Sequence, residues 1–208
     1  MGGERAAAVG GRLQLMGVGR KPGARPATYA DLAALPDNVT GEIVGGELIA
    51  TPRPAPPHAD ASSGIGASLF GAFHRKPGDP GGPGGWWILD EPELHLGEDV
   101  LVPDVAGWRR ERLPKLPSTA FFELAPDWVC EVISPASASI DRVRKFAIYA
   151  RAKVAHCWLV DPLARTLEVF RLENGHWVSA AGHEGDARVR AEPFEAIEVD
   201  LSRWWIEP

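Results

Sequence analysis

Asp127-Trp-Val-Cys-Glu-Val-Ile-Ser-Pro135 is the stretch of this chain that decides the fold. The stretch consists mainly of large apolar residues, interrupted by one acid, Glu131, and it ends at Ser134-Pro135. This pattern predicts a buried β-strand. An ionised carboxylate among apolar neighbours is costly unless it is paired or bound to a metal. Glu131 is therefore the first candidate for a functional residue.

The residues after this strand predict a helix and then more strands. Ser139 is a candidate N-cap for a helix over residues 140–152. The apolar stripe of this helix would consist of Val143, Phe146, Ala147 and Ala150. The strands expected next cover residues 156–160, 167–172 and 176–178. This strand-helix-strand order favours an α/β fold, with a mixed central β-sheet flanked by helices and a crossover between neighbouring parallel strands.

Two hairpins are expected before the decisive strand. Residues 42–49 alternate around Gly45-Gly46, which suits a type I′ turn and forms an N-terminal β-hairpin. In that register Val44 faces Glu47, so Glu42 and Glu47 share one face of the hairpin. The second hairpin joins residues 86–96 to residues 100–108 through Gly-Glu-Asp.

The remaining N-terminal segments predict helices, breaks and a tail. A short helix is expected over residues 27–35 with Thr28 as its N-cap, and a second over residues 58–74 through Ile65, Leu69 and Phe73. The breaks lie in the proline-rich residues 51–57 and the Gly/Pro-rich residues 77–85. Residues 1–26 suit a flexible N-terminal tail, and residues 27–208 suit one domain.

The composition is that of an ordinary globular protein. Of the 208 residues, 45% are hydrophobic and 24% charged, and no apolar run is long enough to span a bilayer or to act as a secretory signal. We therefore expect a cytoplasmic protein with no membrane partner. The net charge of −6 counts against a protein that coats duplex nucleic acid but leaves a nuclease possible. Cys130 and Cys157 lie in apolar runs, where free thiols are usually structural, and no zinc-ligand spacing is present.

A second acid stands in an apolar run. Asp104 follows Pro103 within Val-Leu-Val-Pro-Asp-Val-Ala, and Lys145 lies on the helix expected after Glu131. Two carboxylates can hold Mg²⁺ or Mn²⁺, and a nearby lysine can orient water and stabilise developing charge, which are the needs of phosphodiester hydrolysis. Asp104, Glu131 and Lys145 are therefore the candidate catalytic residues, and Glu47 is the candidate that completes the acidic cluster.

Together these residues resemble the Uma family of restriction-endonuclease-like proteins, within the PD-(D/E)XK nuclease superfamily. The resemblance covers residues 28–178. It rests on Gly46-Glu-Leu48, His58, Pro103-Asp104, Glu131-Val-Ile-Ser-Pro135, Lys145, Tyr149 and Trp158-Leu-Val-Asp161. The resemblance implies a restriction-endonuclease-like core, a metal-dependent endonuclease that acts on DNA, and the backbone carbonyl of Val132 as a further metal ligand. The residue two after Glu131 is Ile133 where the superfamily has lysine, and Uma members are similar in placing the lysine on the next helix.

Other readings of the same residues stay open. Asp141 and Lys145 could form only an exposed ion pair, Pro103-Asp104 could be a turn, and hairpin glutamates such as Glu47 are usually solvated. His58 is expected at a helix start, and no role is assigned to it, to Glu42 or to Tyr149. The alternative function is a catalytically silent nuclease-fold protein that binds or assembles. A thiol hydrolase using Cys130 and His156 lacks the exposed setting that it needs.

Paired cuts in duplex DNA need two active sites, so a homo-oligomer is expected.

Overall fold

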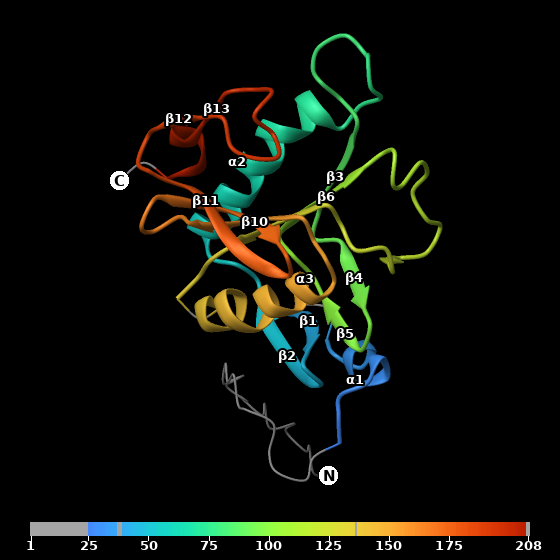
Figure 1. Cartoon of the computed structure of the whole chain (residues 1–208). Helices are drawn as coiled ribbons and strands as arrows, with labels where there is room; N and C mark the ends of the chain where they lie inside the picture. The colour runs from blue at the N-terminus through green and yellow to red at the C-terminus, as the bar shows by residue number, and fades with distance from the viewer. Residues whose placement is uncertain (1–24, 37–38, 136, 207–208) are drawn as a thin grey trace, which may run out of the picture.

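The computed structural model of the chain describes residues 25–36, 39–135 and 137–206, and Figure 1 shows its arrangement. A six-stranded mixed sheet lies at its centre, with the long helix α2 (Pro56–Phe73) on one face and the helix α3 (Phe146–Arg151) on the other (Figure 1). This confirms the expected α/β fold with a mixed sheet between helices. The predicted tail falls almost entirely on residues 1–24, which lie outside the described residues.

The six-stranded sheet holds the decisive strand near its middle. In sheet order its strands are β11 (His176–Glu184), β10 (Thr166–Glu173), β9 (His156–Asp161), β8 (Trp128–Val132), β6 (Val105–Arg109) and β3 (Trp86–Asp90). Only β8 and β9 pair in parallel within this sheet, and η1 (Ile140–Lys145), a π-helical turn, together with α3 joins them. The strand-helix-strand unit that the sequence predicts is therefore present.

A five-stranded sheet packs beside this unit. In order it contains β2 (Glu47–Pro52), β1 (Val39–Val44), β5 (Asp99–Leu101), β4 (Glu93–Leu96) and β7 (Phe121–Phe122). The β1–β2 hairpin has the expected register, with Val44 opposite Glu47, and both turn glycines have positive φ, as a type I′ turn requires. The helix α1 (Tyr29–Ala33) precedes it, and the Thr28 N–H donates to the Asp31 carboxylate at its start.

The second predicted hairpin is divided between the two sheets. Its tip, β4 with β5, belongs to the five-stranded sheet, and its base, β3 with β6, belongs to the six-stranded sheet. The chain leaves one sheet and enters the other at Glu91-Pro92 on one arm and at Val102-Pro103-Asp104 on the other. Proline at both corners removes an N–H donor, so neither ladder can run on through them. Asp104 is therefore held at the junction of the two sheets.

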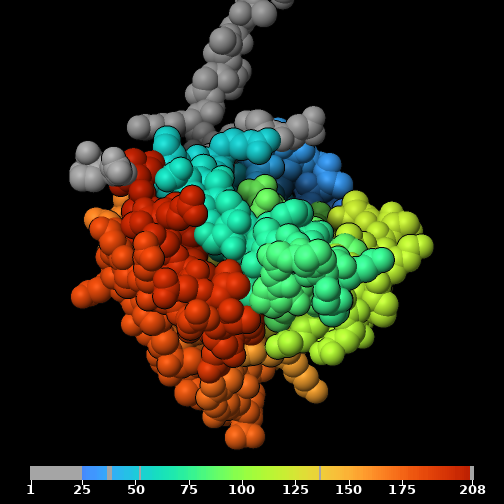
Figure 2. Space-filling view, turned by 90° about the horizontal axis from the view of Figure 1, so that it is seen from above, coloured from blue at the N-terminus to red at the C-terminus, as the bar shows by residue number. Residues whose placement is uncertain are grey.

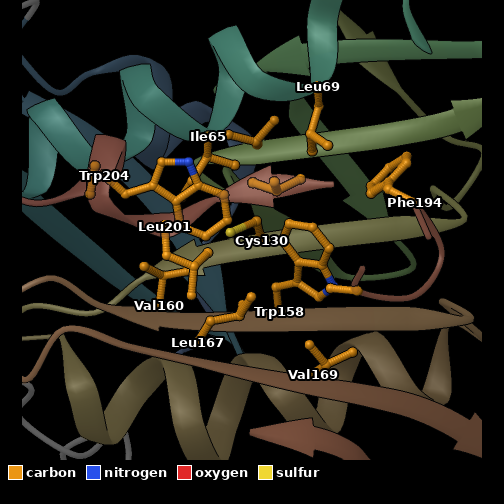
Figure 3. Close-up of a cluster of buried hydrophobic side chains, with 14 of the residues drawn as sticks. Ile65, Leu69, Cys130, Trp158, Val160, Leu167, Val169, Phe194, Leu201 and Trp204 are labelled. Carbon is orange, nitrogen blue, oxygen red and sulfur yellow. The ribbon is translucent and has the colours of Figure 1, made fainter. Parts of the chain in front are cut away.

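The residues of β8 do not alternate between apolar and polar, because hydrophobic side chains pack against both faces of the central sheet. Cys130 and Val132 pack toward α2, whereas Val129 and Ile133 pack toward α3 and the five-stranded sheet. Figure 3 shows Ile65 and Leu69 of α2 above Trp158 and Val160 of β9, and Trp204 completes the layer. Figure 2 shows the C-terminal segment lying beside α2, consistent with the burial of η2 (Leu201–Trp204) against that helix.

Two expectations about the helix after β8 are wrong. Ser139 already has helical backbone angles and its side chain makes no capping hydrogen bond, because the described helix begins at Ala138. Before the helix, the hydroxyl of Ser134 accepts from the Ser137 N–H. The buried face is also not the predicted apolar stripe, because Val143 is 66% exposed. Asp141, Lys145, Ile148 and Tyr149 are buried instead, so the helix turns two charged residues inward.

Candidate active site

Glu131 lies at the centre of a buried hydrogen-bonded cluster. Its side chain points to the α3 face of β8, where the Lys145 Nζ donates to it at 2.9 Å and the Tyr149 hydroxyl at 2.5 Å. Lys145 and Tyr149 are four residues apart on the η1–α3 segment, so their side chains project from the same face. Both carboxylate oxygens of Glu131 are therefore bonded from the same helical segment.

Lys145 is the cation shared by three buried carboxylates. Its Nζ lies 2.8 Å from Glu131 Oε1, 3.0 Å from Glu42 Oε1 and 3.6 Å from Asp141 Oδ1. Burial alone would lower the pKa of Lys145, but the three acids outweigh it and hold that pKa well above its ordinary value. Burial, together with the charges of Asp141, Asp104 and Glu42, raises the pKa of Glu131 well above its usual range against the opposing effect of Lys145. The cluster thus contains more acidic than basic groups.

Asp104 approaches the end of β8 from the corner between the sheets. Its Oδ2 accepts from the backbone N–H of Val132 at 2.7 Å, and its Oδ1 lies 3.2 Å from the Nε2 of His58 on the first turn of α2. Burial lowers the pKa of His58, but the hydrogen bond and charge of Asp104, with contributions from Asp141 and the Val132 carbonyl, raise it overall. The Nδ1 of His58 is buried and has no hydrogen-bond partner among the described residues.

These groups line one cleft of about 370 Å³. Its floor contains Glu42, Asp104, Glu131, Val132, Asp141 and Lys145. Its lining also includes residues of the β1–β2 hairpin, residues of the segment before α2, and Ser134, Pro135 and Ser137 after β8. The lining of this single cavity therefore includes five acids, one lysine, one arginine and one histidine: Glu42, Glu91, Asp104, Glu131, Asp141, Lys145, Arg53 and His58.

Comparison with known proteins identifies the family of this chain. Residues 26–202 match the family Uma2, described as "Putative restriction endonuclease". The chain belongs to the Uma2 family. A crystal structure described as that of a putative nuclease belonging to DUF820 from Anabaena variabilis has the same fold, with a TM-score of 0.68 and 21% identity over 86% of this chain and 99% of that one. A search of curated proteins finds no match.

The structure of this Uma2 chain brings most of the predicted site residues together. Asp104, Glu131, Val132 and Lys145 all line the cleft. Glu47 is the exception: its Oε2 binds Arg144 at 2.8 Å, and it lies outside the cleft lining. Correcting the sequence analysis, the hairpin acid in the cluster is Glu42, which faces inward three residues before the turn.

Four residues of the cluster were not assigned a role from sequence. Tyr149 and Asp141 are both four residues from Lys145, so their shared helix face was a usable signal. Glu42 was visible only as an acid on the same hairpin face as Glu47. His58 had no signal of its own, because its place beside Asp104 depends on how α2 crosses the sheet.

The donor atoms in the cleft suit a hard divalent cation. Asp104 and Glu131 supply carboxylate oxygens, and Val132, which also lines the cleft, has a backbone carbonyl oxygen. Among the described residues no three His, Cys, Asp or Glu side chains form a complete ligand set. Mg²⁺ is commonly held by only one or two carboxylates and keeps several waters, so two carboxylates and a carbonyl fit it. A bound cation would also reduce the repulsion among the acidic groups of the cluster.

Proposed function

We propose that this Uma2 family member is a metal-dependent endodeoxyribonuclease that hydrolyses DNA phosphodiester bonds with Mg²⁺ or Mn²⁺. The single observation that carries the proposal is the convergence of Asp104, Glu131 and Lys145 in one cleft from the sheet junction, the decisive strand and the following helix. Family membership supports a nuclease, and the hard donor atoms support the metal.

In this proposal each residue of the chain has a defined task. Asp104, Glu131 and the carbonyl of Val132 would hold the cation, which when bound supplies charge neutralisation at the phosphoryl oxygens and lowers the pKa of water. The Lys145 ammonium, held by Glu42 and Asp141, stabilises negative charge that develops on the phosphate. Tyr149 fixes the orientation of the Glu131 carboxylate through its hydroxyl.

The setting of the reaction forms part of the proposal. A nuclease that acts on cellular or invading DNA shares the compartment of that DNA, so we place the protein in the cytoplasm. None of the described helices has the length and apolar character to cross a bilayer. The oligomeric state depends on the substrate: cutting both strands of a duplex takes two active sites, hence a homo-oligomer, whereas cutting one strand takes a single copy.

One observation favours the alternative of a catalytically silent nuclease fold. Both carboxylate oxygens of Glu131 already accept from Lys145 and Tyr149, so a cation would have to share them. A silent protein would keep this cluster purely as a structural ion network.

Cleavage by the wild type and by Asp104→Asn tests the proposal. Wild-type protein with Mn²⁺ should convert supercoiled plasmid or cut oligonucleotides, and Asp104→Asn should be slower by about a hundredfold or more, because a neutral amide replaces an anionic ligand. Asp186→Asn is the matched control, since Asp186 is exposed and, among the residues that the structure describes, pairs only with Arg165. Absence of cleavage on plasmid, single-stranded and branched DNA alike, or equal rates for Asp104→Asn and wild type, contradicts the enzyme and favours the silent fold.

A further inference from the structure

We propose that the cleft takes DNA as an unpaired strand, one nucleotide at a time, and not as an intact duplex. This inference rests on the proposed nuclease function and specifies its substrate. Three features carry it: the depth of the reacting groups, the closed floor of the cleft, and the scarcity of unpaired cationic groups among the described residues around it.

The groups that must meet the phosphate lie deep in the protein. The side chains of Lys145 and Glu131 are only 4% and 3% exposed, and Asp104 and His58 are 15% and 16% exposed. A phosphate in a duplex is fixed to two neighbours and to a stacked, paired base. These restraints limit how far a duplex phosphate can enter a narrow cleft, whereas an unpaired nucleotide can enter it together with its base and sugar.

The β1–β2 hairpin and the η1–α3 helical segment contact each other at the base of the cleft. Glu42 of β1 contacts Lys145 of η1 at 3.0 Å, and next to them Glu47 contacts Arg144 at 2.8 Å. The Arg144 guanidinium also donates to the Val44 carbonyl, so the hairpin and the helical segment are joined along this side. The remaining cavity of about 370 Å³ is at the lower end of the range for small-molecule sites, which suits one nucleotide.

The charges around the cleft argue against duplex binding. Duplex affinity comes mainly from neutralising many phosphates, and this chain has a net charge of −6. Three arginines of the neighbouring helical segment already bind acids: Arg142 with Glu168, Arg144 with Glu47 and Arg151 with Asp99.

Arg53 is the basic residue left to meet the strand. It lines the cleft, is exposed and makes no ion pair with any residue that the structure describes. The same lining includes Pro54 and Pro135, which are apolar, and Thr40 and Thr51, which carry hydroxyls. This combination suits a base, a sugar and one phosphate.

Binding without metal tests the substrate class separately from activity. In EDTA at low salt, a fluorescein-labelled single strand too short to fold should bind at least about tenfold more tightly than the duplex of the same sequence, as measured by anisotropy. Arg53→Ala should weaken single-strand binding and reduce the slope of log affinity against log salt by about 0.7, the loss expected for one phosphate contact. Arg188→Ala, a change at an exposed arginine that the cleft lining does not include, should do neither. Equal or tighter binding of the duplex overturns the inference.

Cleavage with Mn²⁺ separates this inference from the proposed function. A single strand, a blunt duplex and a duplex with an unpaired flap are incubated with the wild type. Cutting of the single strand and of the flap, with the blunt duplex at least about tenfold slower, supports the inference. Cutting of the blunt duplex at the same rate overturns the inference and leaves the nuclease function standing. No cutting of any substrate overturns both.

Discussion

At the scale of single residues, the site is organised around one buried ammonium. Lys145 neutralises part of the charge of Glu42, Glu131 and Asp141, all of which are almost completely buried. Removing one partner from a buried ionic cluster leaves the other partners uncompensated, which costs more than the intact cluster contributes. Lys145 is therefore a structural residue as well as a candidate catalytic one.

The Lys145→Met variant should be destabilised. We expect the free energy of unfolding in urea to fall by about 3–5 kcal/mol, because three buried acids lose their shared cation. Sequence alone does not reveal this cost, because it shows only Asp141 as a partner of Lys145. Lys115→Met, at an exposed lysine, serves as the control and should change stability by less than about 0.5 kcal/mol. Equal stability of both variants would contradict the shared-cation arrangement.

A histidine outside the site should make stability depend on pH. Burial is the largest cause that lowers the pKa of His156 below its ordinary value of 6.5, Arg109 adds to it, and Glu192 opposes it. Because the folded pKa is lowered, the unfolded chain binds the proton more readily, so this contribution to stability is present above pH 6.5 and is lost as the pH falls through the folded pKa. His156→Gln should therefore lose less stability than the wild type on acidification below pH 6.5, as measured by urea unfolding across that range. Parallel pH curves for the two proteins would refute this.

Site residues differed in how far sequence could reveal them. Asp104 and Glu131 were predictable, since an acid in an apolar run needs a partner or a metal. Glu42 and Glu47 lie on the same face of the hairpin, so the sequence could not show which of them contacts Lys145. Tertiary packing decides this: Glu42 contacts Lys145, whereas Glu47, the acid predicted from the sequence, contacts Arg144. His58 was out of reach, because nothing local indicates that the first turn of α2 lies beside Asp104.

At the scale of elements, the helical segment after β8 reverses the usual relation between polarity and burial. Val143 lies in solvent, whereas Asp141 and Lys145 face the core. Periodicity predicts the helix itself correctly, but it assigns the buried face by hydrophobicity, and a buried ionic cluster breaks that rule. The π-helical turn, in which the Phe146 N–H reaches the Asp141 carbonyl, is the local irregularity that accompanies the charged face.

Two glycines of α2 should respond oppositely to substitution by alanine. A Cβ on Gly64 would lie 2.8 Å from the Arg203 carbonyl oxygen and 3.0 Å from the Trp204 ring, whereas a Cβ on Gly71 would meet nothing within 4 Å. Gly64→Ala should cost about 1–3 kcal/mol through overpacking against the C-terminal segment. Gly71→Ala should stabilise the protein by about 0.5–1 kcal/mol through helix propensity. Chemical denaturation measures both, and a stabilised Gly64→Ala would show that α2 and η2 are not in contact.

At the scale of the whole molecule, the two sheets share one site. The divided hairpin carries Asp104 at their junction, and the Glu42 side chain reaches from β1 to both the Val102 N–H and Lys145. Sequence predicted the strands of this hairpin but not its division, because the alternation of residues continues across the corner and only the prolines mark it. The single domain over residues 27–208 stays a prediction.

Metal binding should therefore stabilise the molecule globally. A divalent cation that binds the folded cleft shifts the folding equilibrium by mass action, and it also relieves the repulsion among the acids. The melting temperature should rise with millimolar Mn²⁺ or Mg²⁺, and the rise should be much smaller in Glu131→Gln, which keeps the shape and removes the charge. An equal rise in both proteins would place the cation elsewhere.

The contact between Arg144 and the Val44 carbonyl also determines when the site can exist. These residues are 100 positions apart in the chain, whereas Glu131 and Lys145 are 14 apart. Closing a short loop costs less entropy than closing a long one, so the Glu131–Lys145 pair can form early in folding and the N-terminal hairpin joins it late. A chain still emerging from the ribosome presents the hairpin acids long before the lysine that neutralises them. The nuclease cleft is thus a property of the finished fold, and a growing chain carries none of it.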